Sequence, residues 1–463
     1  MRINTNMSAL RSCYQLNRAN DRLSASLERL SSGYKINSAE DSPVGAAMSQ
    51  KMKTQLRGLD RAIQNASDGI SVVETAEGAL NEVTEMIQRM RQLSVQGANG
   101  TMSAQDRQSL MDEISQLQNE IDRISNDTEY NTRGLINGEL SRRTYTDMPG
   151  VRSTYISDAV PAGAYKVIVN SEATYSTLTS NPVDVPVTGI EVDGTINVNG
   201  ESVAIEKGDT IDEVLDKIKG VADLSDISVN YDGTNITFKS DILGSNYPIE
   251  ISCTKELAEK LGLEMKLSAQ GTDADIELDT AVNNVFKFPD STTIEVDGNN
   301  ITFSASGGFE MRVAIDEGTI AAPSVVMVRA LDIGTMVIQM GANEGQVMDI
   351  NIPEVSCAAM GLDKLNLHTE AGCDRAIGMC DDALKYISTV RSKLGAYANR
   401  MEHAVNSLNV TTENMTAALS RIEDVDMAKE MTNFTSQNVI TQAANSMLAQ
   451  ANQMPEKVLQ LLQ

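Results

Sequence analysis

The residues best suited to metal binding, acid–base chemistry or nucleophilic chemistry are few and scattered along this chain. Its two histidines, His368 and His403, belong to no HExxH motif and to no other metal-ligand spacing. We find no Gly-rich phosphate loop, nucleophile elbow or pair of carboxylates spaced for catalysis. We therefore expect no catalytic residue, no metal site and no cofactor, and we interpret His403 as a partly exposed helix residue.

The cysteines lead to the same conclusion. There are five of them, with no CxxC pair, which argues against a zinc site and against a disulfide framework. Cys373 and Cys380 are seven residues apart, about 10 Å along a helix, which is too far for a disulfide. We expect five free thiols that mostly serve in packing, namely Cys13, Cys253, Cys357, Cys373 and Cys380.

Composition narrows the class of protein further. A net charge of −26 argues against nucleic acid or an anionic membrane as a partner. With 4% aromatic residues, no Trp and 23 Met, the chain suits helix seams better than catalytic clefts. It has no apolar leader segment and no run of about 18 apolar residues. We therefore expect neither a cleaved signal nor a membrane span, so exposure outside the cell would need an export route without cleavage.

Both ends of the chain show the apolar periodicity of long helices. The first pattern steps by three and four residues from Leu16 to Leu30 and stops at Gly33. Ser42 followed by Pro43 predicts a new helix start, with a cap and then proline at the first helical position. Further seams predict an antiparallel helical bundle; they cover residues 59–90, 110–124 and 376–408, and a final seam covers 440–461.

Between about residues 140 and 345 the periodicity shifts towards two, which predicts strands. Three dipeptides predict hairpin turns, namely Asn199-Gly200, Asp232-Gly233 and Asp297-Gly298. Thr210 and Glu213 have capping-box spacing and predict a short helix. The predicted fold class is α+β multidomain: a long α-helical coiled-coil or bundle core formed by both chain ends, with an inserted β-rich outer region.

The two terminal segments suggest self-assembly. Each offers one thin apolar stripe that cannot offset its ordering entropy alone, so we expect both to be poorly ordered in the isolated subunit. If the stripes pack among neighbouring copies, a contact that does not close on itself produces an open filament. An ordinary intramolecular bundle is the alternative. The expected polymerisation seam consists of Leu16, Leu23, Leu27, Leu30, Ile440, Ala444, Met447, Ala451, Met454, Val458 and Leu461.

Several long motifs at both ends resemble bacterial flagellins. The N-terminal ones are MRINTNMSALRSCYQLN, LSSGYKINSAEDSPVGAAMS and the run from GLDRAIQNASDGISVVETAEGALNE to EIDRISNDTEYNTRGLINGEL. The C-terminal ones are IQMGANEGQ, MGLDKLNL, VRSKLGAYANRMEHAVNSL, SRIEDVDMAKEMTNFT and MLAQANQMPEKVLQLLQ. Ser42-Pro43 and Thr132 depart from the family's usual pattern, which affects local loop geometry. The central stretch GTINVNGESVAIEKGDTIDEVLDKIK is similar to a hairpin-plus-helix motif inserted in some flagellins and hook-associated proteins.

The resemblance implies a structural subunit of the swimming filament and not an enzyme. It implies an inner tube domain from residues 1–40 and 425–463, a helical bundle core domain from 41–140 and 350–424, and a surface-exposed outer region at 141–349. It also implies export in an unfolded state through the flagellar type III system, with an export chaperone, cap and junction proteins as partners. The location would then be the extracellular flagellar filament, as a homopolymer with no cofactor.

The resemblance also suggests a recognition patch, because some flagellins are bound by Toll-like receptor 5 through the helical domain. The matching motifs are QRMRQLSVQGAN and MDEISQLQNEIDRI. Arg89, Leu93 and Glu113 are the expected central contacts, since Arg89 and Leu93 are four residues apart on a helix. Their expected neighbours are Gln88, Gln96, Ser109, Gln116 and Gln118. The same residues could instead pack against an adjacent subunit.

Other readings remain open. A hook-filament junction protein would share the helical ends and the export route. A metalloprotease, which some flagellins carry in the central insertion, is disfavoured because both histidines lie outside that region. An adhesin that binds a host surface through residues 145–340 could coexist with filament formation.

Overall fold

The computed structural model describes residues 6–157, 159–183, 189–278, 288–289, 291–320, 323–331 and 333–461, without the side chains of 455–461. Helices occupy both ends of the chain and strands occupy the middle, which confirms the predicted fold class. The long helices are α1 (Met7–Ser32), α2 (Pro43–Gly97), α3 (Ala104–Asp127), α7 (Glu370–Glu423) and α8 (Met427–Leu461). The short ones are α4 (Ile211–Ala222), α5 (Lys255–Leu261), α6 (Cys357–Met360), η1 (Asp223–Ser225) and η2 (Leu362–Lys364).

Local signals set the helix ends. Gly33 has φ of 77° and its N–H donates to the Arg29 carbonyl, which ends α1 as predicted. Pro43 is the first residue of α2, and the Gly45 N–H donates to Ser42 Oγ over 3.1 Å. The predicted restart at Ser42-Pro43 is therefore confirmed.

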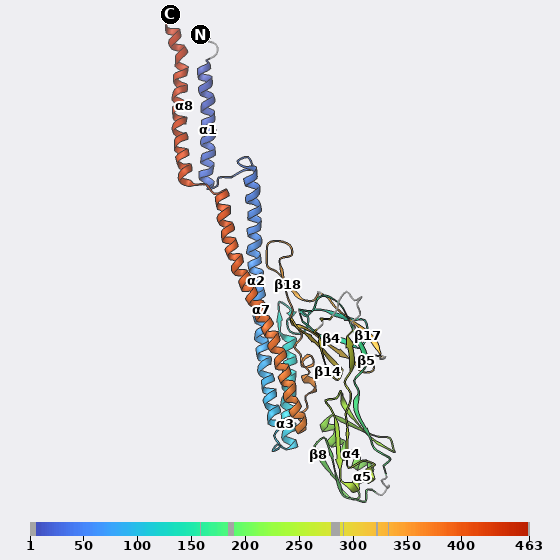
Figure 1. The fold of residues 1–463 in the computed structure, drawn as a ribbon. Coiled ribbons are helices and arrows are strands. Elements are labelled where there is room, and N and C mark those ends of the chain that lie inside the picture. Colours follow the sequence, from blue (N-terminus) through green and yellow to red (C-terminus); the bar gives the residue numbers. More distant parts are fainter. Residues whose placement is uncertain are drawn as a thin grey trace. The chain divides into compact units, whose positions relative to one another are not determined.

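The chain divides into two compact units, and the first comprises Met1–Asp68, Gln339–Val347 and Met401–Gln463. In this unit α1 and α8 lie side by side and antiparallel (Figure 1). Near one end of the pair Asn6 Nδ2 donates to the Ala451 carbonyl over 2.9 Å, and near the other Ser26 Oγ donates to Glu430 Oε1 over 2.5 Å.

The linkers that enter α2 and leave α7 are tied together in the same unit. Tyr34 and Asp424 form an antiparallel bridge, and the Lys35 N–H donates to the Glu423 carbonyl over 2.6 Å. The buried Glu423 carboxylate forms an ion pair with Lys53 of α2. Backbone hydrogen bonds and an ion pair therefore join the linker before α2 to the linker after α7.

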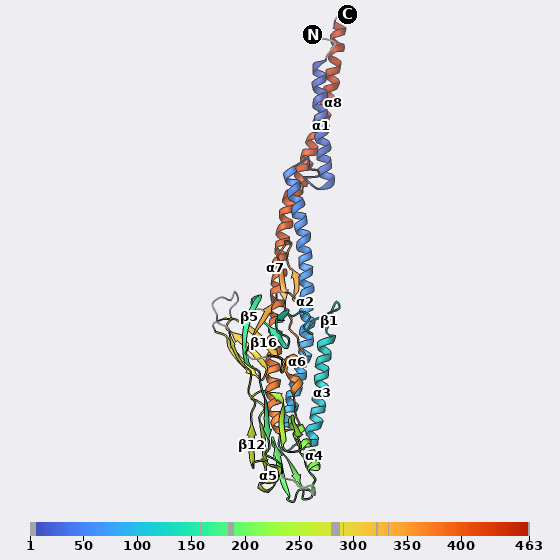
Figure 2. The ribbon, with the colours of Figure 1, turned by 90° about the vertical axis from the view of Figure 1, so that its right-hand side faces the viewer.

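The second unit comprises Gly69–Ile338 and Met348–Arg400. Its helical part contains α3 and segments of α2 and α7, which run along one another (Figure 2). Ion pairs tie α2 to α7, with Arg91 Nε 2.7 Å from Asp381 Oδ1 and Arg391 Nη2 2.9 Å from Glu77 Oε1. Its apolar core follows the predicted seams and includes Leu80, Val83, Ile87, Met90, Ile114, Ile121, Cys380, Ala383, Ile387, Val390 and Leu394.

The β-rich middle contains two lobes with separate cores. We call the first the flanking lobe; its two four-stranded sheets have the orders β13-β5-β17-β3 and β14-β15-β16-β4. Rings fill the space between them, with Tyr165 and Phe303 each 5.2 Å from Phe288 between centroids. The strands are β3 (Thr144–Thr146), β4 (Val151–Ile156), β5 (Gly163–Ser171), β13 (Asp275–Leu278), β14 (Thr293–Asp297), β15 (Asn300–Ala305), β16 (Phe309–Ile315) and β17 (Ser324–Ala330).

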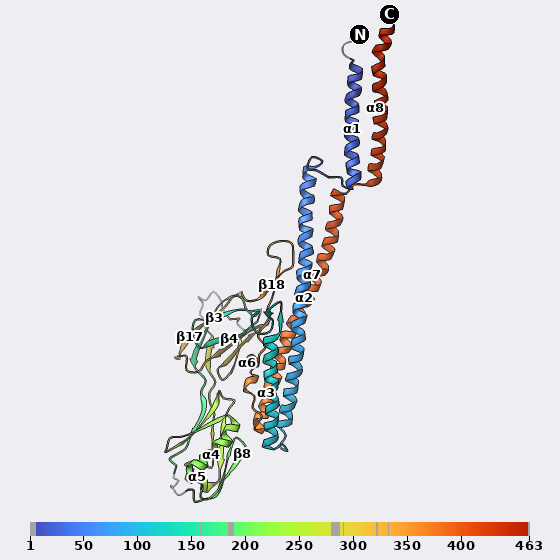
Figure 3. The same ribbon diagram turned by 180° about the vertical axis from the view of Figure 1, so that it is seen from behind.

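We call the second, residues 175–269, the inserted lobe; it carries α4 and α5 (Figure 3). Its sheets have the orders β6-β10-β9 and β12-β11-β7-β8. Its strands are β6 (Tyr175–Thr179), β7 (Gly194–Val198), β8 (Glu201–Ile205), β9 (Ile227–Tyr231), β10 (Ile236–Leu243), β11 (Ile249–Cys253) and β12 (Lys266–Ala269). Elsewhere the short strands are β1 (Glu129–Tyr130), β2 (Arg133–Gly134), β18 (Met336–Gln339) and β19 (Val347–Ile350).

A hairpin forms at each of the three predicted turns, although the last one turns at Gly298-Asn299 because Asp297 still pairs with Asn300. Asn199 and Gly200 have φ of 48° and 98° and connect β7 to β8 as a tight hairpin turn. Thr210 and Glu213 form the expected capping box at the start of α4. Local chemistry was therefore sufficient to place this hairpin and this helix.

Gly97 ends α2 at a point where no side chain fits. A Cβ there would lie 2.7 Å from Sγ of the buried Cys373 and 3.5 Å from Leu110 Cδ1. We expect Gly97→Ala to lower the thermal unfolding midpoint, at a cost of about 1–3 kcal/mol from overpacking. In the same helix Gly78 has no such atom within 4 Å, so Gly78→Ala should be neutral or stabilising by up to about 1 kcal/mol. Circular dichroism melts compare the two variants, and an unchanged midpoint for Gly97→Ala would contradict the packing argument.

Candidate interaction surfaces

The face that α8 turns towards α1 is narrow. Burial along α8 recurs in steps of four and three residues, and the face carries small and polar residues beside two larger apolar ones. The two buried positions are Glu430 and Ala451. The half-buried positions between them are Phe434, Gln437, Asn438, Thr441, Ala444 and Leu448. This pairing therefore buries little apolar surface for its length.

Large apolar side chains instead lie on the outside of the α1–α8 pair. The most exposed are Tyr14, at 71%, and Leu10, at 65%. Eight others are at least 47% exposed, and they are Met7, Leu27, Met427, Met431, Val439, Ile440, Met447 and Met454. We call these ten side chains the outer apolar set. So many large exposed apolar side chains on one helix pair indicate an interaction surface.

The structure divides the predicted polymerisation seam between the two faces. Leu16, Leu23, Leu30 and Ala444 are half-buried in the pair and Ala451 is buried. Leu27, Ile440, Met447 and Met454 belong to the outer apolar set. The side chains of Val458 and Leu461 lie outside the described residues.

Sequence reasoning missed part of the outer apolar set. Leu10, Tyr14 and Val439 do not fall on the stripe that the three-four spacing selected, and they are among the exposed residues. Their signal was available, because a helix with apolar residues on two faces needs two partners. The prediction assigned one apolar stripe to each helix and so left out the apolar residues on the second face.

The structure brings together two of the three expected central contacts of the recognition patch. Arg89 of α2 and Glu113 of α3 form an ion pair, with Arg89 Nε 2.8 Å from Glu113 Oε1. The flanking residues Gln88, Gln96, Ser109 and Gln116 are exposed.

Leu93 does not belong to that exposed face. It is 1% exposed and lies in the core of the helical bundle. The prediction that Leu93 is a surface contact is therefore wrong. Four-residue spacing places two side chains near each other. Four residues nevertheless turn a helix by about 40° more than one full turn, which is enough to carry one of the two side chains into the core. Gln118 is half-buried, and its Nε2 donates to the Leu362 carbonyl over 2.5 Å.

Among the described residues, the cysteines are thiols and the histidines belong to no metal-binding cluster. All five cysteines are free thiols; Cys357, Cys373 and Cys380 are buried, and Cys13 is exposed. Within the described ranges no group of three or more His, Cys, Asp and Glu side chains could hold a metal ion. His368 is half-buried and His403 is exposed. None of the helices described is both long and apolar enough to cross a membrane.

Paired terminal helices, a helical bundle and an inserted β region define a class of α+β proteins with exposed terminal apolar surfaces. Residues 3–141 match the bacterial flagellin N-terminal helical region, and residues 377–462 match the bacterial flagellin C-terminal helical region. Flagellin A from Vibrio anguillarum is 32% identical over 462 residues, covering 100% of this chain and 99% of that protein. A flagellin from Clostridium tyrobutyricum is 34% identical over 455 residues, covering 98% and 99%. The chain belongs to the bacterial flagellin family.

Similarity to solved structures is more distant. FliC from Burkholderia pseudomallei is 17% identical, covering 72% of this chain and 99% of that one with a TM-score of 0.24. Flagellar hook associated protein-3 from Legionella pneumophila is 14% identical, covering 81% and 98% with a TM-score of 0.33. These scores are too low to support an argument about function.

Burial makes three of the thiols unreactive. Desolvation raises the pKa of Cys357 to about 12 and the pKa of Cys373 and of Cys380 to about 11. Because the thiolate is the nucleophile, a pKa near 11 leaves about one part in a thousand ionised at pH 8. We expect iodoacetamide at pH 8 to label Cys13 rapidly in the native protein and these three only after denaturation. Peptide mass spectrometry checks this, with Cys13→Ser as the control, and rapid native labelling of Cys380 would refute it.

Proposed function

We propose that this protein polymerises through its α1–α8 pair into the bacterial flagellar filament used for swimming. The observation that carries the proposal is the outer apolar set, which the α1–α8 contact leaves in solvent. A neighbouring copy offers an apolar surface of the same composition. Burial of that surface stabilises both the contact and the order of the two helices. Disorder of the terminal segments in the isolated subunit remains a prediction.

Charge supports contact between copies at this pair. The whole chain has a net charge of −26, so copies repel one another over most of their surface. Residues 427–463 contain two lysines and two glutamates, and residues 1–32 contain five arginines and two acids. The terminal helices therefore carry none of the excess negative charge, and apolar contact between them meets no strong repulsion.

The remaining parts of the proposal follow from family membership. Export in an unfolded state through the flagellar type III system is compatible with five free thiols, because no disulfide would need to be broken before threading. The location is then the extracellular filament, with an export chaperone, cap and junction proteins as partners. The role is structural and not catalytic. A hook-filament junction protein is the alternative, and full-length matches to proteins named flagellin favour the filament subunit.

Two exposed side chains of α8 provide a direct test of polymerisation. Ile440 and Met447 are 47% and 59% exposed. Replacing both with glutamine removes about 2 kcal/mol or more of contact per added subunit. We expect the double variant I440Q/M447Q to raise the critical concentration for seeded filament growth by roughly 30-fold. Sedimentation and electron microscopy provide the measurement.

The matched control is N445A/Q450A, because both residues are polar and exposed on the same helix. It should change the critical concentration by no more than about twofold. Filaments that grow equally well from I440Q/M447Q and from wild-type protein would count against the outer apolar set as the polymerisation surface.

We further propose that the exposed face of α2 and α3 is recognised by Toll-like receptor 5. The observation that favours this is the Arg89–Glu113 ion pair, which joins the two helices at the centre of the expected patch. Gln88, Gln96, Ser109 and Gln116 surround it, and Gln118 contributes in part. Leu93 is left out because it is buried.

A receptor-binding experiment tests this patch in monomeric protein. We expect R89A/E113A to weaken binding to the receptor ectodomain by roughly 30-fold, the loss typical of two central interface residues. The control is D382A/K385A, which removes an exposed ion pair from α7, outside the matching motifs, with 2.7 Å between Lys385 Nζ and Asp382 Oδ1. Equal affinities of the two variants would eliminate the assignment.

A further inference from the structure

The inserted lobe folds around its own apolar core. That core lies entirely within residues 178–269 and includes Ile196, Val214, Phe238, Ile251 and Leu261. The chain enters and leaves the lobe at one place, where the Thr174 N–H donates to the Thr272 carbonyl over 2.8 Å and the two hydroxyls lie 2.9 Å apart. Beside the crossing, the Tyr175 hydroxyl donates to Glu317 Oε2 and Asn246 Nδ2 donates to Asp297 Oδ1, both outside the lobe. A lobe with a complete core that is joined to its neighbour along one edge is able to move as a single body.

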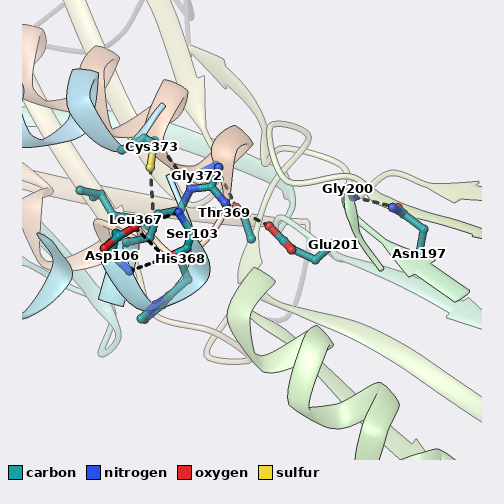
Figure 4. Close-up of polar contacts among 12 residues, drawn as sticks. Ser103, Asp106, Asn197, Gly200, Glu201, Leu367, His368, Thr369, Gly372 and Cys373 are labelled. Atoms are coloured by element: carbon teal, nitrogen blue, oxygen red, sulfur yellow. Dashed lines mark hydrogen bonds and ion pairs between the residues drawn. The ribbon is translucent and has the colours of Figure 1, made fainter. Parts of the chain in front are cut away.

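One contact outside this crossing joins the lobe to the start of α3. Arg107 is 6% exposed, and its Nε donates to the Gly97 carbonyl over 3.1 Å. Its Nη1 lies 3.4 Å from Glu201 Oε1 on β8. In Figure 4 the Glu201 side chain points away from its hairpin towards the segment that carries Thr369 and Gly372.

Glu201 is the one carboxylate paired with this buried guanidinium in the part of the chain that the structure describes. A buried cation without its partner is strongly unfavourable. Glu201 is itself well positioned, because the Asn199-Gly200 turn beside it is held by β11. There the Glu250 N–H donates to Asn199 Oδ1 over 2.7 Å.

Two further contacts join the lobe to the segment at the start of α7. Asn366 Nδ2 donates to the Leu224 carbonyl over 3.0 Å and to Asp226 Oδ2 over 2.7 Å. The Arg375 guanidinium lies 5.0 Å from the centroid of the Tyr247 ring. Like the Arg107–Glu201 pair, these are polar or cation–π contacts, so their strength depends on charge and geometry.

The inserted lobe is acidic, and two arginines contact it. Residues 175–269 contain 17 acidic residues, seven lysines and no arginine. The surface that meets them presents Arg107 and Arg375. Attraction of this kind orients an acidic body on a basic contact and weakens as salt screens it.

We propose that Arg107 and Glu201 form an electrostatic latch that docks the inserted lobe on the turn end of the α2–α3 hairpin. Asn366 and Arg375 supply the supporting contacts. Docking holds the lobe in one orientation and holds the Arg107 guanidinium against the Gly97 carbonyl, where the turn begins. When the latch is broken, the lobe swings about its Thr174–Thr272 crossing as an intact body. Arg107 is then free to leave the Gly97 carbonyl, which loosens the turn that follows.

Hydrogen exchange of the full-length monomer, followed by mass spectrometry, tests the latch. In E201Q we expect exchange of amides in residues 97–103 and 366–372 to accelerate by about tenfold, since one partner of a buried pair is removed. E201K should accelerate it further. Amides of β7, β10 and β11 should keep wild-type protection, because the lobe stays folded. The control E250Q removes an exposed acid from the same lobe and should behave as wild type.

Salt supplies an independent readout. Raising sodium chloride from low to molar concentration should accelerate exchange of residues 97–103 in wild type by less than the E201Q substitution does, because salt screens a partly buried pair only weakly. It should have little effect in E201Q, which lacks the pair. Unchanged exchange at 97–103 in both Glu201 variants would overturn the latch. Loss of protection in β7, β10 and β11 together with the turn would also overturn the latch. It would mean that Glu201 is needed for the lobe to fold and not for docking of a folded lobe.

Discussion

Two helices packed side by side share one face, and this geometric limit governs the terminal part of the molecule. The shared face of α1 and α8 is lined largely by small, polar and half-buried side chains, with Ser26 and Glu430 hydrogen-bonded inside it. Ten large apolar side chains remain on the outside. A two-helix unit of this kind gains little from burial relative to the entropy that it loses on ordering. This is why we propose that further copies of the chain stabilise it.

Charge and apolar surface are distributed in a complementary way along the chain. The acidic residues concentrate in the β-rich middle, and the terminal helices have almost balanced charge. Electrostatic repulsion between copies acts over most of the surface. It is weak at the terminal helices, because they carry no excess negative charge. The same uneven distribution directs the acidic inserted lobe towards Arg107 and Arg375.

The α2–α3 hairpin serves as a common platform for two surfaces. Its exposed face carries the Arg89–Glu113 pair, and its turn end carries Arg107. The two pairs differ physically. Arg89 and Glu113 are about half exposed, so water screens their attraction, whereas the Arg107 side chain is 8% exposed and depends on Glu201. An exposed pair offers its polar atoms to a partner, and a buried one holds parts of the chain together.

The sequence by itself determined the features that depend on neighbouring residues. These are the end of α1 at Gly33, the start of α2 at Pro43, the Asn199-Gly200 hairpin, the capping box of α4 and the buried seams of the bundle. Each follows from backbone preference, a local hydrogen bond or apolar periodicity, and these act over a few residues.

Tertiary structure alone decided which face of each helix meets a partner. It moved Leu93 into the core, left Ile440 and Met447 outside the α1–α8 pair, and brought Arg107 to Glu201 across 94 positions of sequence. Spacing along a helix specifies which residues share a face but not the direction in which that face points. That direction depends on how distant segments pack, because burial is a property of the assembled surface and not of the local sequence.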